Sequence, residues 1–226
     1  MLVLTGESQP APGRYIAVEG VIGVGKTSLA RLLAEHLHAR LLLEEPEANP
    51  FLEDFYKDPR RHAFSTQMFF LVSRYQELRE LRQPDLFHDA VVSDYMFQKD
   101  RIFANLNLND RELMLYDKIA PVLERDLPLP SLVVYLQASP DVIWSRIQQR
   151  GRHYERVMDP KYTATLAEAY NYFFFHYREA PLLVVNTNDL NFVDRRADLE
   201  ELVARIESHR EGVAYLSPTG TAGEKP

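Results

Sequence analysis

The stretch that most constrains this chain is Gly20–Thr27, with the sequence Gly-Val-Ile-Gly-Val-Gly-Lys-Thr. It has the form G-x-x-x-x-G-K-[ST], in which backbone amides surround phosphate oxygens, the lysine reaches the outer phosphates and the hydroxyl ligates Mg²⁺. An apolar run at 15–18 predicts a strand before it, and the apolar spacing of 28–37 predicts a helix after it. A tight strand-to-helix turn that merely contains a lysine is the alternative, which this context disfavours. The predicted phosphate-binding residues are Gly20, Val21, Ile22, Gly23, Val24, Gly25, Lys26, Thr27 and Ser28.

The composition limits the class of protein. Hydrophobic residues make up 46% of the 226 residues, which is enough for the core of one α/β domain. A net charge of −7 argues against a nucleic-acid polymer as partner, and the lack of cysteine excludes disulfides and thiolate chemistry. We find no apolar run of membrane-spanning length and no signal-peptide pattern, and therefore expect a cytoplasmic enzyme without a membrane partner. We expect a flexible segment at 1–13, one domain at 14–210 and a disordered tail at 211–226.

Short apolar runs alternate with longer segments of helical periodicity along the chain. The predicted strands lie at 15–18, 40–43, 90–93, 132–136 and 182–185. The principal predicted helices lie at 28–37, 60–82, 99–106, 110–126, 140–150, 160–179 and 193–209. This alternation predicts a three-layer α/β fold with a five-stranded parallel sheet flanked by helices, and ligands bind at the carboxyl ends of such strands.

Carboxylates follow two of the predicted strands. Glu45 can accept the proton of an attacking hydroxyl, although Glu44 competes for that role and a solvated loop acid is the alternative. Asp94 follows the strand at 90–93 and is predicted to hold Mg²⁺ together with Thr27, with a helix cap as the alternative. Mg²⁺ is therefore the expected cofactor.

The long helix at 60–82 carries polar residues that can bind a flat base. Gln67 and Arg74 are seven residues apart and share one face, with Phe64, Phe70 and Tyr75 nearby. An amide can bind a base edge through two hydrogen bonds, and a guanidinium can donate to ring acceptors. A helix with one polar stripe is the alternative.

Four arginines gather around the end of the helix that stops at Gly151, namely Arg146, Arg150, Arg152 and Arg156. Like charges at i,i+4 repel unless an anion lies between them, and a phosphoryl group in transfer is such an anion. The alternative is a solvated basic helix end, which the helix dipole favours.

These motifs, in this order over roughly residues 14–190, resemble the deoxynucleoside kinase family, which contains deoxycytidine, deoxyguanosine and deoxyadenosine kinases. The resemblance implies a P-loop fold with an arginine-rich lid. It also implies transfer of the γ-phosphoryl group of ATP to the 5′-hydroxyl of a deoxynucleoside, in a homodimer that works in nucleotide salvage. The chain looks most similar to bacterial members that act on purine deoxynucleosides.

The resemblance also assigns roles to residues. Glu45, which precedes Pro46, matches the presumed catalytic base, and Tyr56 matches a tyrosine that contacts the sugar 3′-hydroxyl. Gln67 and Arg74 match the pair that contacts the base. In the lid, the arginines match residues that bind phosphates and Glu155 matches a second contact to the 3′-hydroxyl. Thus Glu45, Lys26, Arg146 and Arg150 are the predicted catalytic residues, and Arg150 and Arg152 join the ATP site. The loop at 186–189 falls where the family holds the adenine of ATP.

One departure concerns the residues after the third predicted strand. Family members usually carry an acid, an arginine and a serine there, whereas this chain has Asp94 followed by Tyr95. Arg101 or a lid arginine can replace the missing cation. A family aspartate that contacts the base corresponds to Asp100, or to Lys99 in an ungapped match. The predicted substrate-binding residues are Glu45, Tyr56, Gln67, Arg74, Asp94, Asp100 and Glu155.

Two other functions fit parts of the pattern. A nucleoside monophosphate kinase of the thymidylate type shares the loop and lid, but the acid at Glu45 would face the acceptor's phosphate. A non-catalytic nucleotide-binding module would leave the face with Gln67 and Arg74 without a purpose.

Overall fold

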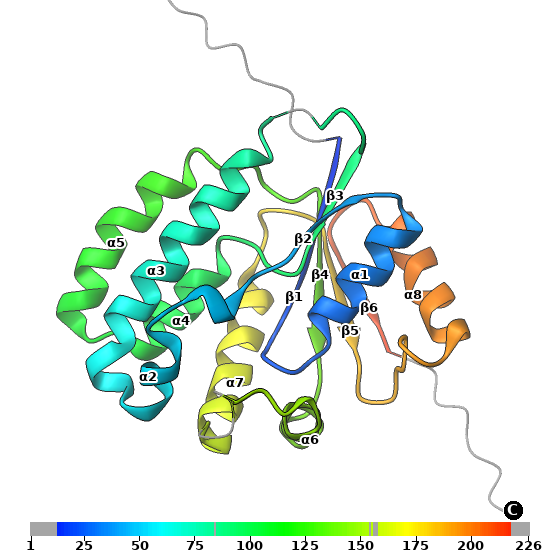
Figure 1. Ribbon diagram of the computed structural model, residues 1–226. Coiled ribbons are helices and arrows are strands. Elements are labelled where there is room, and N and C mark those ends of the chain that lie inside the picture. The colour runs from blue at the N-terminus through cyan, green and yellow to red at the C-terminus, as the bar shows by residue number, and fades with distance from the viewer. Residues whose placement is uncertain (1–12, 84, 154, 156–157, 218–226) are drawn as a thin grey trace, which may run out of the picture.

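Six parallel strands form one sheet in the order β2-β3-β1-β4-β5-β6 (Figure 1). The computed structural model describes residues 13–83, 85–153, 155 and 158–217. The strands are β1 Arg14–Gly20, β2 Arg40–Leu42, β3 Ala90–Ser93, β4 Leu132–Gln137, β5 Leu182–Asn186 and β6 Val213–Leu216. The central strands are buried almost throughout, as expected for a parallel sheet covered on both faces.

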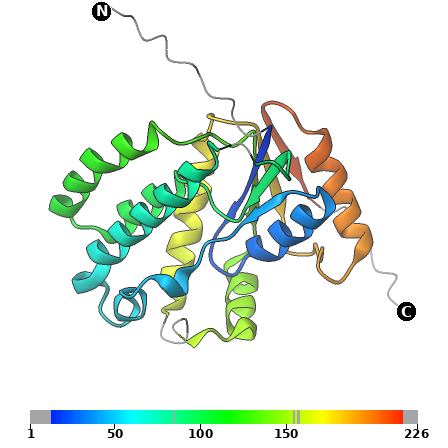
Figure 2. The same ribbon diagram turned by 45° about the horizontal axis from the view of Figure 1, so that its top comes forward.

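Helices cover both faces of the sheet (Figures 1 and 2). On one face lie α1 Lys26–His36 and α8 Arg196–Ser208. On the other face lie α3 Pro59–Glu80, α4 Lys99–Asn107, α5 Asp110–Glu124 and α7 Pro160–His176. The short elements η1 Pro46–Ala48 and α2 Leu52–Lys57 precede α3, and α6 Pro140–Arg150 precedes α7. The predicted three-layer α/β architecture is confirmed.

The position of β1 in the sheet determines where a ligand can bind. β1 pairs with β3 on one side and with β4 on the other, so the strand order reverses at its carboxyl end. In open α/β sheets, ligands bind in the crevice at such a point. The predicted phosphate-binding loop follows β1 directly, and therefore lies at this crevice.

The predicted number of five strands is wrong. The sixth strand, β6, pairs in parallel with β5 and lies within the segment at 211–226 that was expected to be disordered. Only Leu216 is buried in this four-residue edge strand, which explains why its sequence gives a weak apolar signal. Among the described residues, no helix is both long and apolar enough to cross a membrane.

Local signals for helix ends are largely confirmed. Asn109 caps α5, and its side chain forms a capping box with Glu112. Such a cap stabilises a helix by about 1 kcal/mol. Gly151 ends α6 in the left-handed conformation, at φ 66°. Arg152, the next residue, therefore lies just beyond the end of the helix.

Candidate active site

The backbone of the loop at 20–27 has the geometry that its glycines predict. Gly20 and Gly25 have φ values of 146° and 110°, which L side chains rarely adopt. A Cβ atom on Gly20 would lie 2.5 Å from the carbonyl oxygen of Leu136. Gly25 is the N-cap of α1, so the helix begins where the loop closes. The loop and this helix N-terminus together form a suitable site for phosphate.

Lys26 lies at the base of this loop. Its Nζ donates a hydrogen bond to the carbonyl oxygen of Val21 at 3.2 Å. Burial lowers the pKa of Lys26 to about 8, and the positive charge of Lys99 lowers it further, against Glu19 and Asp94, which raise it. An incoming anion would stabilise the charged form of Lys26, because phosphate oxygens can compensate its buried positive charge.

Thr27 and Asp94 come together as the motif predicts. Thr27 Oγ1 donates to Asp94 Oδ2 at 2.5 Å, and the backbone N–H of Glu44 donates to Asp94 Oδ1 at 2.8 Å. The N-cap position of α4 belongs to Gln98, so Asp94 does not cap that helix. A hydroxyl and a carboxylate beside a phosphate loop fit Mg²⁺, which binds one or two protein oxygens along with substrate phosphates and water. Among the described residues, no group of three or more His, Asp or Glu forms a metal site without a substrate.

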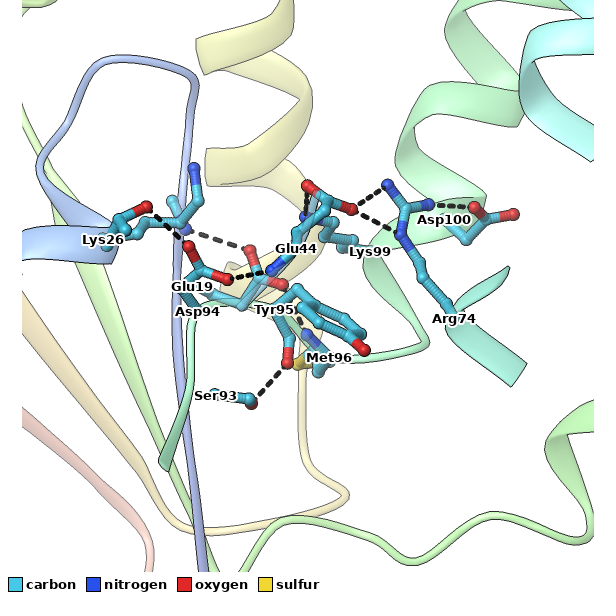
Figure 3. A network of polar contacts seen from close by, with 12 residues as sticks. Glu19, Lys26, Glu44, Arg74, Ser93, Asp94, Tyr95, Met96, Lys99 and Asp100 are labelled. Atoms are coloured by element: carbon cyan, nitrogen blue, oxygen red, sulfur yellow. Dashed lines mark hydrogen bonds and ion pairs between the residues drawn. The ribbon is translucent and has the colours of Figure 1, made fainter. Parts of the chain in front are cut away.

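Charged side chains continue from the phosphate loop towards α3 and α4 (Figure 3). Arg74 donates to Glu44 Oε1 from Nε at 2.8 Å and forms an ion pair from Nη2 at 2.6 Å. Its Nη1 donates to Asp100. Lys99 Nζ donates to the other oxygen of Glu44, Oε2, at 2.8 Å. Burial alone would raise the pKa of Glu44, but Arg74 and Lys99 hold it well below its usual range.

Gln67 joins this network beside the pocket. Its Nε2 donates to the carboxylate of Asp100 at 2.7 Å and to the carbonyl oxygen of the same residue at 2.9 Å. Gln67 and Arg74 are both 4% exposed, and Asp100 is fully buried. Asp100 and Lys99 are the two candidate counterparts of the family aspartate that contacts the base. Of these, it is Asp100 that contacts both predicted base-binding residues. Burial raises the pKa of Asp100, and Arg74 opposes this effect.

A pocket of about 320 Å³ lies against this network. Its walls combine aromatic rings with polar groups, the composition usual for small-molecule sites. The aromatic and apolar lining includes Leu52, Phe55, Tyr56, Phe70, Phe103 and Tyr162. The polar lining includes Lys26, Thr27, Glu44, Glu45, Gln67, Arg74, Asp94, Asn107, Arg150, Arg152 and Glu155. We call this cavity the acceptor pocket.

Two of the aromatic residues expected beside Gln67 face elsewhere. Phe70 lines the acceptor pocket, and the guanidinium of Arg74 lies 4.8 Å from its ring centroid. Phe64 lines a shallow groove on the outer side of α3 and not the acceptor pocket. Tyr75 contacts the guanidinium of Arg79. A helix of 22 residues buries more than one face, and apolar spacing alone does not tell which face meets the pocket.

A second cleft, of about 780 Å³, lies on the other side of Lys26. Its lining combines the phosphate loop, the lid arginines and the loop after β5. The residues are Gly23 to Ser28, Arg146, Gln149, Arg150, Arg152 and Asn188 to Arg195. We call this cavity the donor cleft. Of the loop at 186–189 expected to hold adenine, residues 188 and 189 line it.

The lid arginines differ in their contacts. Arg150 pairs with Glu155, which is 3% exposed, and Arg152 lies 3.3 Å from Glu47. Arg146 donates to the carbonyl oxygen of Val24 at 3.1 Å and also contacts Thr187, so it ties the phosphate loop to the segment after β5. Arg156 lies outside the described residues.

The two neighbouring glutamates after β2 differ sharply. Glu44 is fixed between two cations, whereas Glu45 is exposed and lines the acceptor pocket. A carboxylate whose pKa is held low is a weak proton acceptor, so this contrast favours Glu45 over Glu44 as a base. Tyr56 lines the same pocket, next to Phe55.

Sequence reasoning missed three buried polar residues. Glu19 accepts from the backbone N–H groups of Gly20 and Met96, and so connects the phosphate loop to the β3–α4 segment. In the sequence, Lys99 stands out only as the ungapped counterpart of the family aspartate. Tyr116, on α5, interacts with Asp100. The sequence does contain a signal for Glu19, because it is a charged residue at the end of an otherwise apolar strand, and such residues are rarely buried without partners. Arg101, a suggested replacement for the missing family arginine, is exposed and does not line either cavity.

Comparisons with known proteins agree with this geometry. A family model described as deoxynucleoside kinase matches residues 16–211, a range that includes the phosphate loop, both cavities and the lid. Deoxyguanosine kinase of Bacillus subtilis (strain 168) is 33% identical over 198 residues, which cover 85% of this chain and 96% of that protein. Deoxyadenosine kinase of Dictyostelium discoideum is 34% identical over 213 residues, covering 91% and 82% respectively. The solved structure of deoxyadenosine kinase from M. mycoides with bound dATP superposes with a TM-score of 0.74 at 25% identity, over 86% of this chain and all of that one.

Proposed function

The chain belongs to the deoxynucleoside kinase family, and from this premise we propose that it transfers the γ-phosphoryl group of ATP to the 5′-hydroxyl of a purine deoxynucleoside. One observation carries the proposal. The acceptor pocket and the donor cleft share Lys26, Thr27, Arg150 and Arg152. A triphosphate in the cleft and a hydroxyl in the pocket would therefore meet at these residues. Such positioning contributes most of the rate acceleration in phosphoryl transfer.

The purine preference rests on two observations. Relatives from B. subtilis and D. discoideum are named as deoxyguanosine and deoxyadenosine kinases. In this chain, Gln67 and Arg74 present an amide and a guanidinium to the acceptor pocket, and the buried carboxylate of Asp100 holds both from behind. These groups can donate to and accept from the edge of a purine, and Phe70 offers a flat apolar surface to its ring.

The other groups of the acceptor pocket receive matching roles. Glu45 orients the 5′-hydroxyl and accepts its proton as the bond to phosphorus forms. Tyr56 and Glu155, which lie about a hundred positions apart in the chain, both line the acceptor pocket and hold the sugar. Arg150 keeps Glu155 in place. A nucleoside occupying the pocket would draw Glu155 towards its 3′-hydroxyl and release Arg150 towards phosphate.

The donor cleft supplies charge and dipoles for the triphosphate. Backbone N–H groups of the loop at 20–27 and the start of α1 surround the phosphates, and Lys26 reaches the outer ones. Arg150 and Arg152 add positive charge where the phosphoryl group moves. Arg146 is fixed to the loop by Val24, so its predicted catalytic contribution includes holding that loop in shape.

Mg²⁺ would be held by Thr27 and Asp94, whose oxygens already lie together. Its chemistry there would be to offset the negative charge of the phosphates. The protein's own part is to present Asp94 in a fixed orientation, which the backbone N–H of Glu44 secures.

We further infer a homodimer in the cytoplasm. Apolar residues are exposed on the outer layer of α3 and α5, which pack against each other (Figure 1). Val72 is 42% exposed, Met114 59% and Val122 60%, which is unusual for an isolated surface. A second copy covering this layer would bury them. Light scattering on the wild type and on Val122→Glu tests the dimer, which the substitution is expected to weaken.

A phosphorylation screen with labelled ATP tests the function. It includes the four deoxynucleosides, their ribose forms and their monophosphates. We expect 5′-monophosphates from deoxyadenosine and deoxyguanosine. Product from monophosphates alone would indicate the thymidylate-type activity, and ATP binding without any product would indicate a binding module. Neither alternative is favoured by the family match.

A further inference from the structure

Lys99 is a buried ammonium group that the proposed reaction does not use. Its side chain is 3% exposed, and its Nζ lies 2.8 Å from Glu44 Oε2 and 5.4 Å from the centre of the Tyr95 ring. It comes from the first turn of α4, next to Asp100, and lines neither the acceptor pocket nor the donor cleft. Buried lysines are rare unless they are paired, because losing water disfavours the charged form.

Ion pairs join Lys99 to three other largely buried charged groups, and the charges of Glu19 and Lys26 also act on it. Lys99 and Arg74 face the carboxylates of Glu44 and Asp100, so the group has two positive and two negative charges (Figure 3). Glu44 is shared, since one oxygen contacts Arg74 and the other contacts Lys99. Its side chain therefore has a single orientation that satisfies both cations.

Glu44 in turn fixes Arg74. Two guanidinium nitrogens, Nε and Nη2, contact Glu44, and the third contacts Asp100. A planar guanidinium held at both edges has a defined orientation towards the pocket. If Glu44 rotated, Arg74 would lose two of its three hydrogen-bonded or ion-pair contacts to carboxylates and keep the one to Asp100.

We propose that Lys99 is a positioning residue for the nucleoside: its ammonium holds the carboxylate of Glu44, and Glu44 holds Arg74 in the orientation that binds the base. This inference rests on the proposed function. It also identifies Lys99 as the replacement for the arginine that the family resemblance implies at the position of Tyr95. Tyr95 occupies that position and packs under the ammonium, while Lys99 delivers its charge one helical turn later.

Removing the ammonium would leave one unpaired negative charge in a buried group. Glu44 and Asp100 would then share the single cation Arg74. Glu44 would no longer be held in one orientation, so Arg74 would be positioned less well for the base. The other titratable groups that interact with Glu44 are Lys26, Glu77, Tyr95 and Tyr170, and Asp94 contacts its backbone.

Steady-state kinetics of Lys99→Met and Lys99→Arg test the proposal, with deoxyguanosine and deoxyadenosine as acceptors. For Lys99→Met we expect the KM for the nucleoside to rise about tenfold to a hundredfold, as for the loss of a charged hydrogen bond. The KM for ATP should stay within about threefold, because the phosphate loop is intact. Lys99→Arg should restore most of the loss, and kcat at saturating nucleoside should change much less than KM in both variants.

Lys57→Met is the matched control. Lys57 forms an ion pair with Glu53 at 2.7 Å, but both side chains are about half exposed, so its loss should leave both KM values unchanged. If Lys99→Met does not fold, Glu44→Gln is compared with the double variant Glu44→Gln/Lys99→Met, which leaves no unpaired charge at these two positions. A residue that acts through Glu44 should add little once Glu44 is gone.

The outcomes are distinguishable. A wild type that phosphorylates no deoxynucleoside overturns the proposed function. An active wild type with an unchanged nucleoside KM in Lys99→Met, or with a fall in kcat as large as the rise in KM, overturns the role of Lys99. A double variant with a nucleoside KM about tenfold above that of Glu44→Gln would overturn the route through Glu44.

Discussion

The acceptor pocket and the donor cleft share one wall but are built differently. In and behind the wall of the acceptor pocket, the charged side chains from α3, α4 and the end of β2 are already paired with one another and largely buried. The donor cleft is larger and is lined by two loops and by arginines at the end of α6. Its main binding groups are backbone N–H groups and cations at the surface.

This difference indicates where selectivity arises. A pre-paired buried network tolerates few ligands, because each ligand must replace or complement fixed hydrogen bonds. A phosphate loop binds any triphosphate tail through the backbone, so it discriminates less between bases. We therefore expect changes in the acceptor pocket to alter the choice of nucleoside, and changes in the donor cleft to alter the rate with every nucleoside.

The largest effect should come from Lys26, which both cavities share. Lys26→Met removes a buried charge beside the moving phosphoryl group, and we expect kcat/KM to fall about 10³-fold with all acceptors alike. Coupled-assay kinetics on the wild type, this variant and Lys161→Met measure the effect. A loss confined to one nucleoside would contradict the separation of the two sites.

The next effect separates the neighbouring glutamates. Glu45→Gln should lower kcat about 10²-fold with little change in the KM for the nucleoside, because it removes the proton acceptor. Glu44→Gln should instead raise that KM, because it releases Arg74. The comparison of kcat and KM for the two variants checks the assignment. An unchanged kcat in Glu45→Gln would show that another group takes the proton.

A smaller and more selective effect is expected at Asp100. Asp100→Asn keeps the shape but removes the charge opposite Arg74 and Gln67, so the KM for a purine deoxynucleoside should rise about thirtyfold. The ratio between deoxyadenosine and deoxyguanosine should also change. Asp126→Asn, at an exposed position, is the control. Equal losses for all four deoxynucleosides would place Asp100 outside base selection.

The smallest effect concerns pH and the donor cleft. Burial lowers the pKa of Lys26 to about 8, and a bound phosphate raises it, so ATP binding above pH 8 takes up a proton. The affinity for ATP should therefore weaken roughly tenfold between pH 7 and pH 9. Calorimetry at pH 8.5 in buffers of different ionisation enthalpy measures the uptake, which should vanish in Lys26→Met. Proton release on binding would contradict the assignment.

Local patterns in the sequence predicted the backbone geometry of the donor side well. The loop at 20–27 needs its glycines, lysine and threonine at fixed spacing, because backbone conformation and phosphate binding depend on neighbours in the chain. Gly151 and Asn109 likewise end or begin helices through contacts within a few residues. Such features are visible in one stretch of sequence.

The acceptor side depends on contacts that no single stretch contains. Lys99 and Glu44 are 55 positions apart and meet only because β2 and α4 lie beside the same pocket. The side-chain directions after β2 decide that Glu44 is held by two cations while Glu45 is exposed to the pocket. The sequence does not specify these directions. The same limit hid the outward turn of Phe64 and the edge strand β6.

A single molecule that spans both cavities tests the central claim most directly. Adenosine and deoxyadenosine joined through their 5′ oxygens by a chain of four or five phosphates would place one base in each cavity. If the cavities meet at Lys26, calorimetry should show it binding at least about 10²-fold more tightly than ATP, and excluding both ATP and the nucleoside. Binding no tighter than ATP, with the nucleoside still able to bind, would contradict a shared site of transfer.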